Sequence, residues 1–278
     1  MLKKGAEGLR MFKSKIENFW YQNILKNLLN LSKLGRTSIK GDADSGINFD
    51  HMYQNIPQGQ NIFGAFIDKV LLNLPSVKAT RNRKDIIIKI LKNEVLNNLV
   101  LKKKTRILDI ASGPARYLVD LVSGFAQNEI EVLCIDKDRR SLDFGKILAG
   151  SKPVRYAKID VSRTRHLQRL GKRIKWAPNI ILCSGLFEYK EDEFVDRILR
   201  EVGRNIDQDG LFVFISQTAN PTKKLMGKLG STSEGKRWEL IYRNPEHFRK
   251  WVLNLGFRDV IISVDSLGMY EFCTCRKV

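Results

Sequence analysis

The chain has few of the features that mark secreted, membrane-spanning or metal-binding proteins. It has four cysteines and three histidines among 278 residues, and Cys273 and Cys275 are too close together for the usual pair of metal ligands. No apolar run approaches the roughly 20 residues that a membrane-spanning helix needs, and no secretory leader pattern is present. We therefore expect buried thiols, no metal site, no transmembrane segment and a cytoplasmic location.

Acidic residues are scarce relative to basic ones. The sequence holds 30 Asp and Glu against 49 Lys and Arg, a formal net charge of +19. Residues 1–104 contribute 19 basic and 8 acidic side chains, so more than half of the excess lies in the first part of the chain. Such a field attracts nucleic acid, an anionic membrane surface or an anionic small molecule. A basic surface that only keeps the protein soluble is the alternative.

A turn of small residues is the most informative part of the sequence. From Thr105 the chain reads T-R-I-L-D-I-A-S-G-P-A-R-Y-L, an apolar run, a turn over Ala111–Ala115 and an amphipathic stretch from Arg116. A strand, a tight turn and a helix in this order bring backbone N–H groups close to a ligand, and small residues permit the approach. No lysine followed by serine or threonine comes after the turn, which argues against a P-loop.

Four more apolar runs alternate with helical patterns, which predicts a parallel sheet wrapped by helices. The second run ends in Asp136, 27 residues after Asp109, where such folds bind a ribose through its hydroxyls. Asp138 is better placed to cap the helix that follows. The four runs are Glu131–Asp136, Val154–Ile159, Asn179–Ser184 and Leu211–Ile215.

Together these motifs resemble the class I S-adenosylmethionine-dependent methyltransferases, over roughly Lys102–Val278. L-D-I-A-S-G-P-A-R-Y-L resembles the first motif of that family, C-I-D-K-D the ribose-binding motif and C-S-G-L-F-E-Y the fourth motif. More narrowly, S-G-L-F-E-Y and G-K-R-W resemble an uncharacterised bacterial methyltransferase subgroup. The resemblance implies an α/β fold with a doubly wound, seven-stranded, mostly parallel sheet, a C-terminal antiparallel hairpin and added N-terminal helices.

The resemblance also implies a binding site for S-adenosylmethionine. Backbone groups of the first motif would approach the methionyl part, Asp136 the ribose and Asp160 the adenine, although a surface-turn role for Asp160 stays open. An arginine before the first motif would meet the carboxylate, unless it lies in a solvated basic turn. The implied cofactor residues are Asp109, Ala111, Ser112, Gly113, Ala115, Asp136, Lys137, Asp160, Val161, Cys183, Ser184, Gly185 and either Arg81 or Arg83.

The acceptor of the methyl group is less defined. Glu188 and Tyr189 follow the fourth strand and are the candidate catalytic residues, needed only if the accepting atom must lose a proton. The insertion Gln217–Arg243 mixes basic, aromatic and apolar residues, which suits a small or amphiphilic acceptor that is anionic or lipid-like. It would also suit nucleic acid, and a solvated loop is the alternative. An RNA methyltransferase and a non-catalytic cofactor-binding module remain alternatives.

The first hundred residues match no cofactor motif. Phe12–Leu31 predicts a basic amphipathic helix that would contact a membrane, a partner or its own domain. Gly35–Gln60 predicts a loop or flexible hinge, and Ile62–Leu74 and Asp85–Leu99 predict helices. The resemblance implies that these helices close over the cofactor. We therefore expect a basic segment with a flexible loop over 1–60, cap helices over 61–100 and a methyltransferase domain over 101–278.

Overall fold

The computed structural model describes residues 15, 17, 19–163 and 176–278. The chain divides into two compact units, one from the N-terminal region to Lys78 together with Pro221–Glu239, and one formed by Ala79–Asn220 and Leu240–Val278. The predicted domain boundaries near residues 60 and 100 stay a prediction. No helix of the described part is long and apolar enough to cross a membrane.

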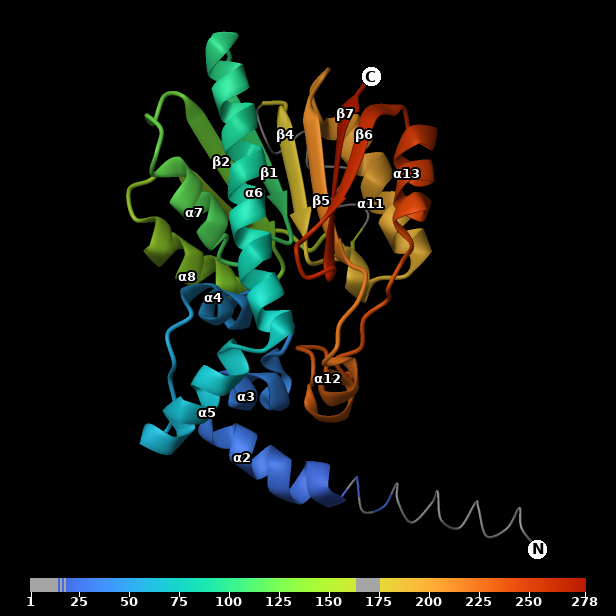
Figure 1. The fold of residues 1–278 in the computed structure, drawn as a ribbon. Helices are drawn as coiled ribbons and strands as arrows, with labels where there is room; N and C mark the ends of the chain where they lie inside the picture. Colours follow the sequence, from blue (N-terminus) through green and yellow to red (C-terminus); the bar gives the residue numbers. More distant parts are fainter. Residues whose placement is uncertain (1–14, 16, 18, 164–175) are drawn as a thin grey trace, which may run out of the picture. The chain divides into compact units, whose positions relative to one another are not determined.

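The larger unit is built on a seven-stranded sheet of order β3-β2-β1-β4-β5-β7-β6 (Figure 1). The first five strands are parallel, β7 runs antiparallel to β5, and β6 runs antiparallel to β7. This is the predicted doubly wound sheet with its terminal hairpin. The strands are β1 (Thr105–Ile110), β2 (Ile130–Asp136), β3 (Val154–Lys158), β4 (Ile180–Ser184), β5 (Leu211–Gln217), β6 (Phe257–Val264) and β7 (Tyr270–Lys277).

Helices cover both faces of the sheet. Figure 1 shows α6 (Pro75–Val100), α7 (Arg116–Val122) and α8 (Arg139–Ala149) on one face, and α11 (Asp192–Asn205) and α13 (Pro245–Asn254) on the other. Glu94 of α6 ties that helix to the sheet, because it forms an ion pair of 2.7 Å with Arg276 of β7.

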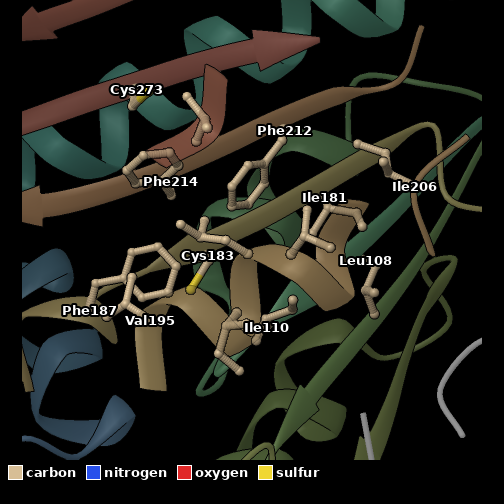
Figure 2. Packing of buried hydrophobic residues seen from close by; sticks show 14 of the residues in the cluster. Leu108, Ile110, Ile181, Cys183, Phe187, Val195, Ile206, Phe212, Phe214 and Cys273 are labelled. Carbon is tan, nitrogen blue, oxygen red and sulfur yellow. The ribbon is translucent and has the colours of Figure 1, made fainter. Parts of the chain in front are cut away.

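The core between the sheet and helices α11 and α13 is apolar and partly aromatic. Figure 2 shows Ile181 and Cys183 of β4 beside Phe212 and Phe214 of β5. The ring of Phe187, which follows β4, lies 5.5 Å from that of Phe214 between centroids. Burial of this cluster stabilises the packing of the sheet against α11 and α13, so the ends of the strands are held in place.

The smaller unit is helical and has a core of its own. Leu34, Met52, Leu72 and Val77 are buried together, and Trp238 of the insertion packs against them. Glu17 forms ion pairs with Lys224 and Lys228 of the insertion. The described elements are η1 (Trp20–Leu25), α2 (Lys26–Leu31), α3 (Lys33–Thr37), η2 (Ser38–Asp42), α4 (Gly46–Gln54), α5 (Ile62–Leu72) and α12 (Lys223–Leu229).

Two sequence-based expectations about this region are wrong. Most of the predicted loop Gly35–Gln60 is helical, because Ser32 and Ser45 cap α3 and α4 by accepting hydrogen bonds from backbone N–H groups. Arg81 and Arg83 lie inside α6, so the alternative that they belong to a solvated basic turn is wrong. Pro75 is the first residue of that helix, where its missing N–H costs nothing, so the helix begins well before the predicted start at Asp85.

Candidate functional site

The first-motif turn follows β1 in an unusual backbone conformation. Ala111, Gly113 and Ala115 all have positive φ, at 56°, 57° and 54°. Two alanines in this region cost on the order of 1 kcal/mol each, so the surroundings must hold the turn. One anchor is the Tyr156 hydroxyl, which donates to the Pro114 carbonyl at 2.9 Å. Gly145 of α8 leaves room for the Tyr156 ring, because a Cβ there would lie 2.5 Å from it.

Asp136, at the end of β2, provides the second anchor. One carboxylate oxygen accepts from the Gly113 N–H at 2.8 Å, and the other accepts from the Asp138 N–H at 2.8 Å. Burial raises the pKa of Asp136, and these two hydrogen bonds oppose the rise. Asp138 caps α8, as predicted, because its side chain accepts from the Arg140 N–H. Lys137, between the two acids, is exposed.

Asp109 is completely buried near the end of β1. Its Oδ2 accepts from the Tyr117 hydroxyl at 2.7 Å, and its Oδ1 has no hydrogen-bond partner among the described residues. Burial raises the pKa of Asp109 well above its ordinary value, and the nearby charge of Asp136 raises it further, against the Tyr117 hydrogen bond. The ends of β1 and β2 therefore hold two carboxyl groups that favour a positively charged partner.

Asp160 lies after β3 and is held by a local turn. Its Oδ1 accepts from the Ser162 N–H at 3.0 Å and from the Ser162 hydroxyl at 2.6 Å, and Arg163 lies 3.4 Å from Oδ2. Burial acts to raise the pKa of Asp160, but the Ser162 hydrogen bonds and the charges of Arg163 and Lys137 outweigh it, so the pKa is lowered. Val161 beside it is buried.

The end of β4 brings a second group of predicted residues together. Cys183 is fully buried in the apolar core, and the Ser184 hydroxyl has no hydrogen-bond partner in the described part of the chain. Gly185 has a φ of 82°. A Cβ added there would lie 3.3 Å from Nη1 of Arg83 and 3.9 Å from Oε1 of Glu188, so the glycine lets both side chains approach the strand end.

Glu188, one of the two candidate catalytic residues, has a raised pKa. It is buried in the short helix η3 (Phe187–Tyr189), and no described residue gives its Oε2 a hydrogen bond. Burial raises the pKa of Glu188 to about 6, although the positive charges of Arg83 and Arg243 oppose the rise. A carboxyl group with this pKa can exchange a proton near neutral pH.

The two candidate arginines differ. Arg83 is buried, and its guanidinium lies 4.9 Å from the centroid of the Tyr270 ring. Arg81 is half-buried, and burial lowers its pKa. Arg83 thus lies beside Gly185 and Glu188. Tyr189 is half-buried at the end of η3.

Three further residues lie near the strand ends: the sequence left Tyr117 between bordering the site and plain packing, and it gave Arg243 and Glu271 no cofactor or catalytic role. Tyr117 binds Asp109, as described above. Arg243 holds η3, because it donates to the Phe187 carbonyl at 2.7 Å and also pairs with Asp192. Its only sequence signal was its place in a basic insertion. The third residue is Glu271 of β7, which looks like an ordinary strand acid.

Glu271 is fully buried opposite Ser216 of β5. Both carboxyl oxygens of Glu271 and the Ser216 hydroxyl lack hydrogen-bond partners among the described residues. Burial alone raises the pKa of Glu271 from 4.5 to about 7. Ser216 is the penultimate residue of β5, so this polar pair lies at the carboxyl ends of the parallel strands, as the first-motif turn does.

The buried carboxyl group of Glu271 makes a prediction about stability. Because its folded pKa is raised, protonation stabilises the fold below pH 4.5, and this stabilisation is lost as the pH rises through about 7. The loss is on the order of 3 kcal/mol. We expect Glu271→Gln to reduce the fall in the free energy of unfolding between these pH values, measured by urea unfolding. The exposed acid in Glu193→Gln is the control, and equal pH slopes in Glu271→Gln and the native chain would contradict the assignment.

Comparison with known proteins supports the fold. The structure resembles that of a possible exported protein from Bordetella parapertussis, with a TM-score of 0.69 at 17% identity, over 90% of this chain and 85% of that one. It also resembles magnesium protoporphyrin IX methyltransferase from Synechocystis with bound SAH, with a TM-score of 0.55 at 11% identity, over 84% of this chain and 95% of that one. At these identities the likeness shows a shared Rossmann-like fold.

Sequence comparison identifies the family. The uncharacterized protein YnbC of Escherichia coli is 28% identical over 233 residues, which cover 82% of this chain and 39% of YnbC. The chain therefore spans about two fifths of the length of that relative. The family described as "Putative methyltransferase" matches residues 10–277. Because this match covers nearly the whole sequence, the chain belongs to that methyltransferase family.

Proposed function

We propose that the protein transfers the methyl group of S-adenosylmethionine to a small-molecule or amphiphilic, lipid-like acceptor. The observation that carries the cofactor assignment is the pair of carboxyl groups Asp109 and Asp136 at the ends of β1 and β2, whose pKa values are both raised by burial. S-adenosylmethionine has an ammonium and a sulfonium group, so it supplies the positive charge that this edge of the sheet favours. The free, buried thiols of all four cysteines suit a reducing cytoplasm.

The residues at the strand ends fit the parts of this cofactor. The Asp109 Oδ1, which lacks a partner among the described residues, would accept from the amino group. The half-buried Asp136 has lone pairs left for the ribose hydroxyls after it accepts two backbone N–H groups. Asp160 and Val161 would contact the adenine, and Arg83 the carboxylate, since guanidinium groups pair with carboxylates through two hydrogen bonds.

Methyl transfer depends mainly on alignment of the acceptor atom with the methyl group. S-adenosylmethionine supplies an activated methyl group when bound. Glu188 would take a proton from an acceptor that must lose one, and the cations of Arg83 and Arg243 keep part of its population ionised at neutral pH. Arg243 also holds the backbone of η3 through the Phe187 carbonyl, so it positions Glu188 and Tyr189.

Two other functions remain alternatives. RNA methylation is favoured by the net charge of +19. A non-catalytic cofactor-binding module is favoured by the alanines at Ala111 and Ala115 in place of the expected glycines, although both adopt the positive φ that the turn requires.

Incubation with radiolabelled methyl donor and fractionated extracts distinguishes these functions. We expect label in a small-molecule or lipid fraction of the extract. Label in RNA that is sensitive to ribonuclease would support the RNA alternative instead. Cofactor binding without transfer to any fraction would support the non-catalytic alternative.

Asp136 should be needed for cofactor binding. Asp136→Ala should weaken the affinity for S-adenosylmethionine by roughly 1.5–3 kcal/mol, because hydrogen bonds to a charged group are lost. Asp138→Ala is the matched control, since it removes the side-chain contacts of Asp138 with α8 but keeps the backbone N–H that binds Asp136, and it should leave the affinity unchanged. Calorimetry would measure both variants, and an unchanged affinity in Asp136→Ala would refute the ribose assignment.

Glu188 and Tyr189 should affect turnover more than binding. With Glu188 as a base, turnover should rise with pH through about 6 and then level off, because only the ionised carboxylate accepts a proton. Glu188→Gln should lower turnover and remove this rise, Tyr189→Phe should lower turnover, and the exposed-acid control Glu193→Gln should do neither. A parallel loss of cofactor affinity and turnover would make Glu188 and Tyr189 structural parts of the pocket wall.

A further inference from the structure

The outward face of α5 is apolar, which is unusual for the surface of a soluble unit. Ile62 is 91% exposed and Phe66 is 61% exposed. Phe63 is 54% exposed and Val70 is 50% exposed. Residues four apart lie on one side of a helix, so Ile62, Phe66 and Val70 form one stripe, with Phe63 at its edge. We call these four residues the α5 stripe.

The opposite face of α5 is fixed, so the helix cannot turn to bury this stripe. Gly64 packs so closely on α2 that a Cβ would lie 2.3 Å from the Leu31 carbonyl oxygen. Asp68 is fully buried and accepts from the backbone N–H groups of Leu34 and Gln58, at 2.7 and 2.8 Å. His51 lies 2.9 Å from the same carboxylate. Rotation of α5 would break all of these contacts.

A second apolar stripe lies on η1 and on α2, and α2 packs against both η1 and α5. Its four exposed side chains are Phe19, which precedes η1, Trp20 and Ile24 of η1, and Leu28 of α2. Helices α2 and α5 are side by side within the smaller unit (Figure 1). The unit therefore presents two aromatic and aliphatic stripes on packed helices.

The charge of the unit narrows the choice of partner. Residues 1–78 and 221–239 together contain 16 Lys and Arg against 8 Asp and Glu. Lys69 is exposed on α5, one turn after Phe66 and next to Val70, and Lys15 is exposed ahead of Phe19 and Trp20. Bulky apolar anchors flanked by lysine suit the interface of an anionic bilayer, where apolar burial and surface charge act together.

We propose that the α5 stripe and the Phe19–Leu28 stripe form a docking surface for an anionic lipid membrane. Aliphatic side chains such as Ile62 and Val70 would add nothing to binding of RNA, which uses stacking and phosphate contacts. Docking of this kind is independent of the methyl acceptor. It would place a lipid-like acceptor near the enzyme without a membrane-spanning helix, which the described chain lacks.

Vesicle co-sedimentation of the full-length protein tests this surface. We expect binding to vesicles of phosphatidylcholine with phosphatidylglycerol, less binding to phosphatidylcholine alone, and weaker binding as salt is raised. Phe63→Gln with Phe66→Gln should lower the vesicle affinity by about tenfold or more, because two anchors are lost. Ile147→Gln, at an 80% exposed apolar residue of α8, is the matched control and should bind as the native chain does.

Other outcomes would overturn the proposal. Both variants should keep the native circular dichroism spectrum, because the substituted side chains are exposed. Lys69→Glu provides a second test, and it should weaken binding to anionic vesicles only. Equal vesicle binding by native chain and double variant would refute the α5 stripe. A different outcome is that the native chain fails to bind vesicles while the double variant loses another interaction. Loss of self-association would then assign the surface to a second copy of the chain, and loss of RNA binding in filter assays would assign it to RNA.

Discussion

The site depends on the carboxylate of Asp136 and the two backbone N–H groups that it accepts. Gly113 belongs to the first-motif turn, and Asp138 begins the approach to α8, so one side chain joins the ends of β1 and β2 to the start of a helix. The turn has three residues with positive φ, two of them alanines, and would not persist without such anchors. The same carboxylate has lone pairs left for a ligand, so the group that holds the turn is also the one proposed to bind the ribose.

A consequence of this arrangement is electrostatic. Asp136 lies close enough to Asp109 to raise its pKa, and Asp109 is fully buried with one oxygen that no described residue binds. At the end of β4, burial raises the pKa of Glu188 and the positive charges of Arg83 and Arg243 partly offset this rise. One end of the site thus favours a cation and the other holds a carboxylate that can exchange a proton. This division fits a cationic methyl donor at the first motif and an acceptor beside Glu188.

The sequence predicted the parts of the molecule that local patterns determine. Alternating apolar runs gave the strands, and Asp138 was correctly assigned as a cap, because both depend on neighbouring residues. The helices within Gly35–Gln60 were missed because short helices depend on burial of Leu34 and Met52 against residues farther along the chain. For the same reason the packing of Trp238 with the N-terminal helices could not be predicted. Glu271 was missed because no local pattern shows that a strand acid is buried without a partner.

Proton release on ligand binding tests the central claim most directly. Titration calorimetry with S-adenosylhomocysteine, which keeps the amino group, would be run in two buffers of different ionisation enthalpy. The account predicts binding with net release of protons, since the ligand cation favours the ionised form of Asp109, and Asp109→Asn should abolish the release. Binding with the same enthalpy in both buffers, or no binding at all, would contradict it.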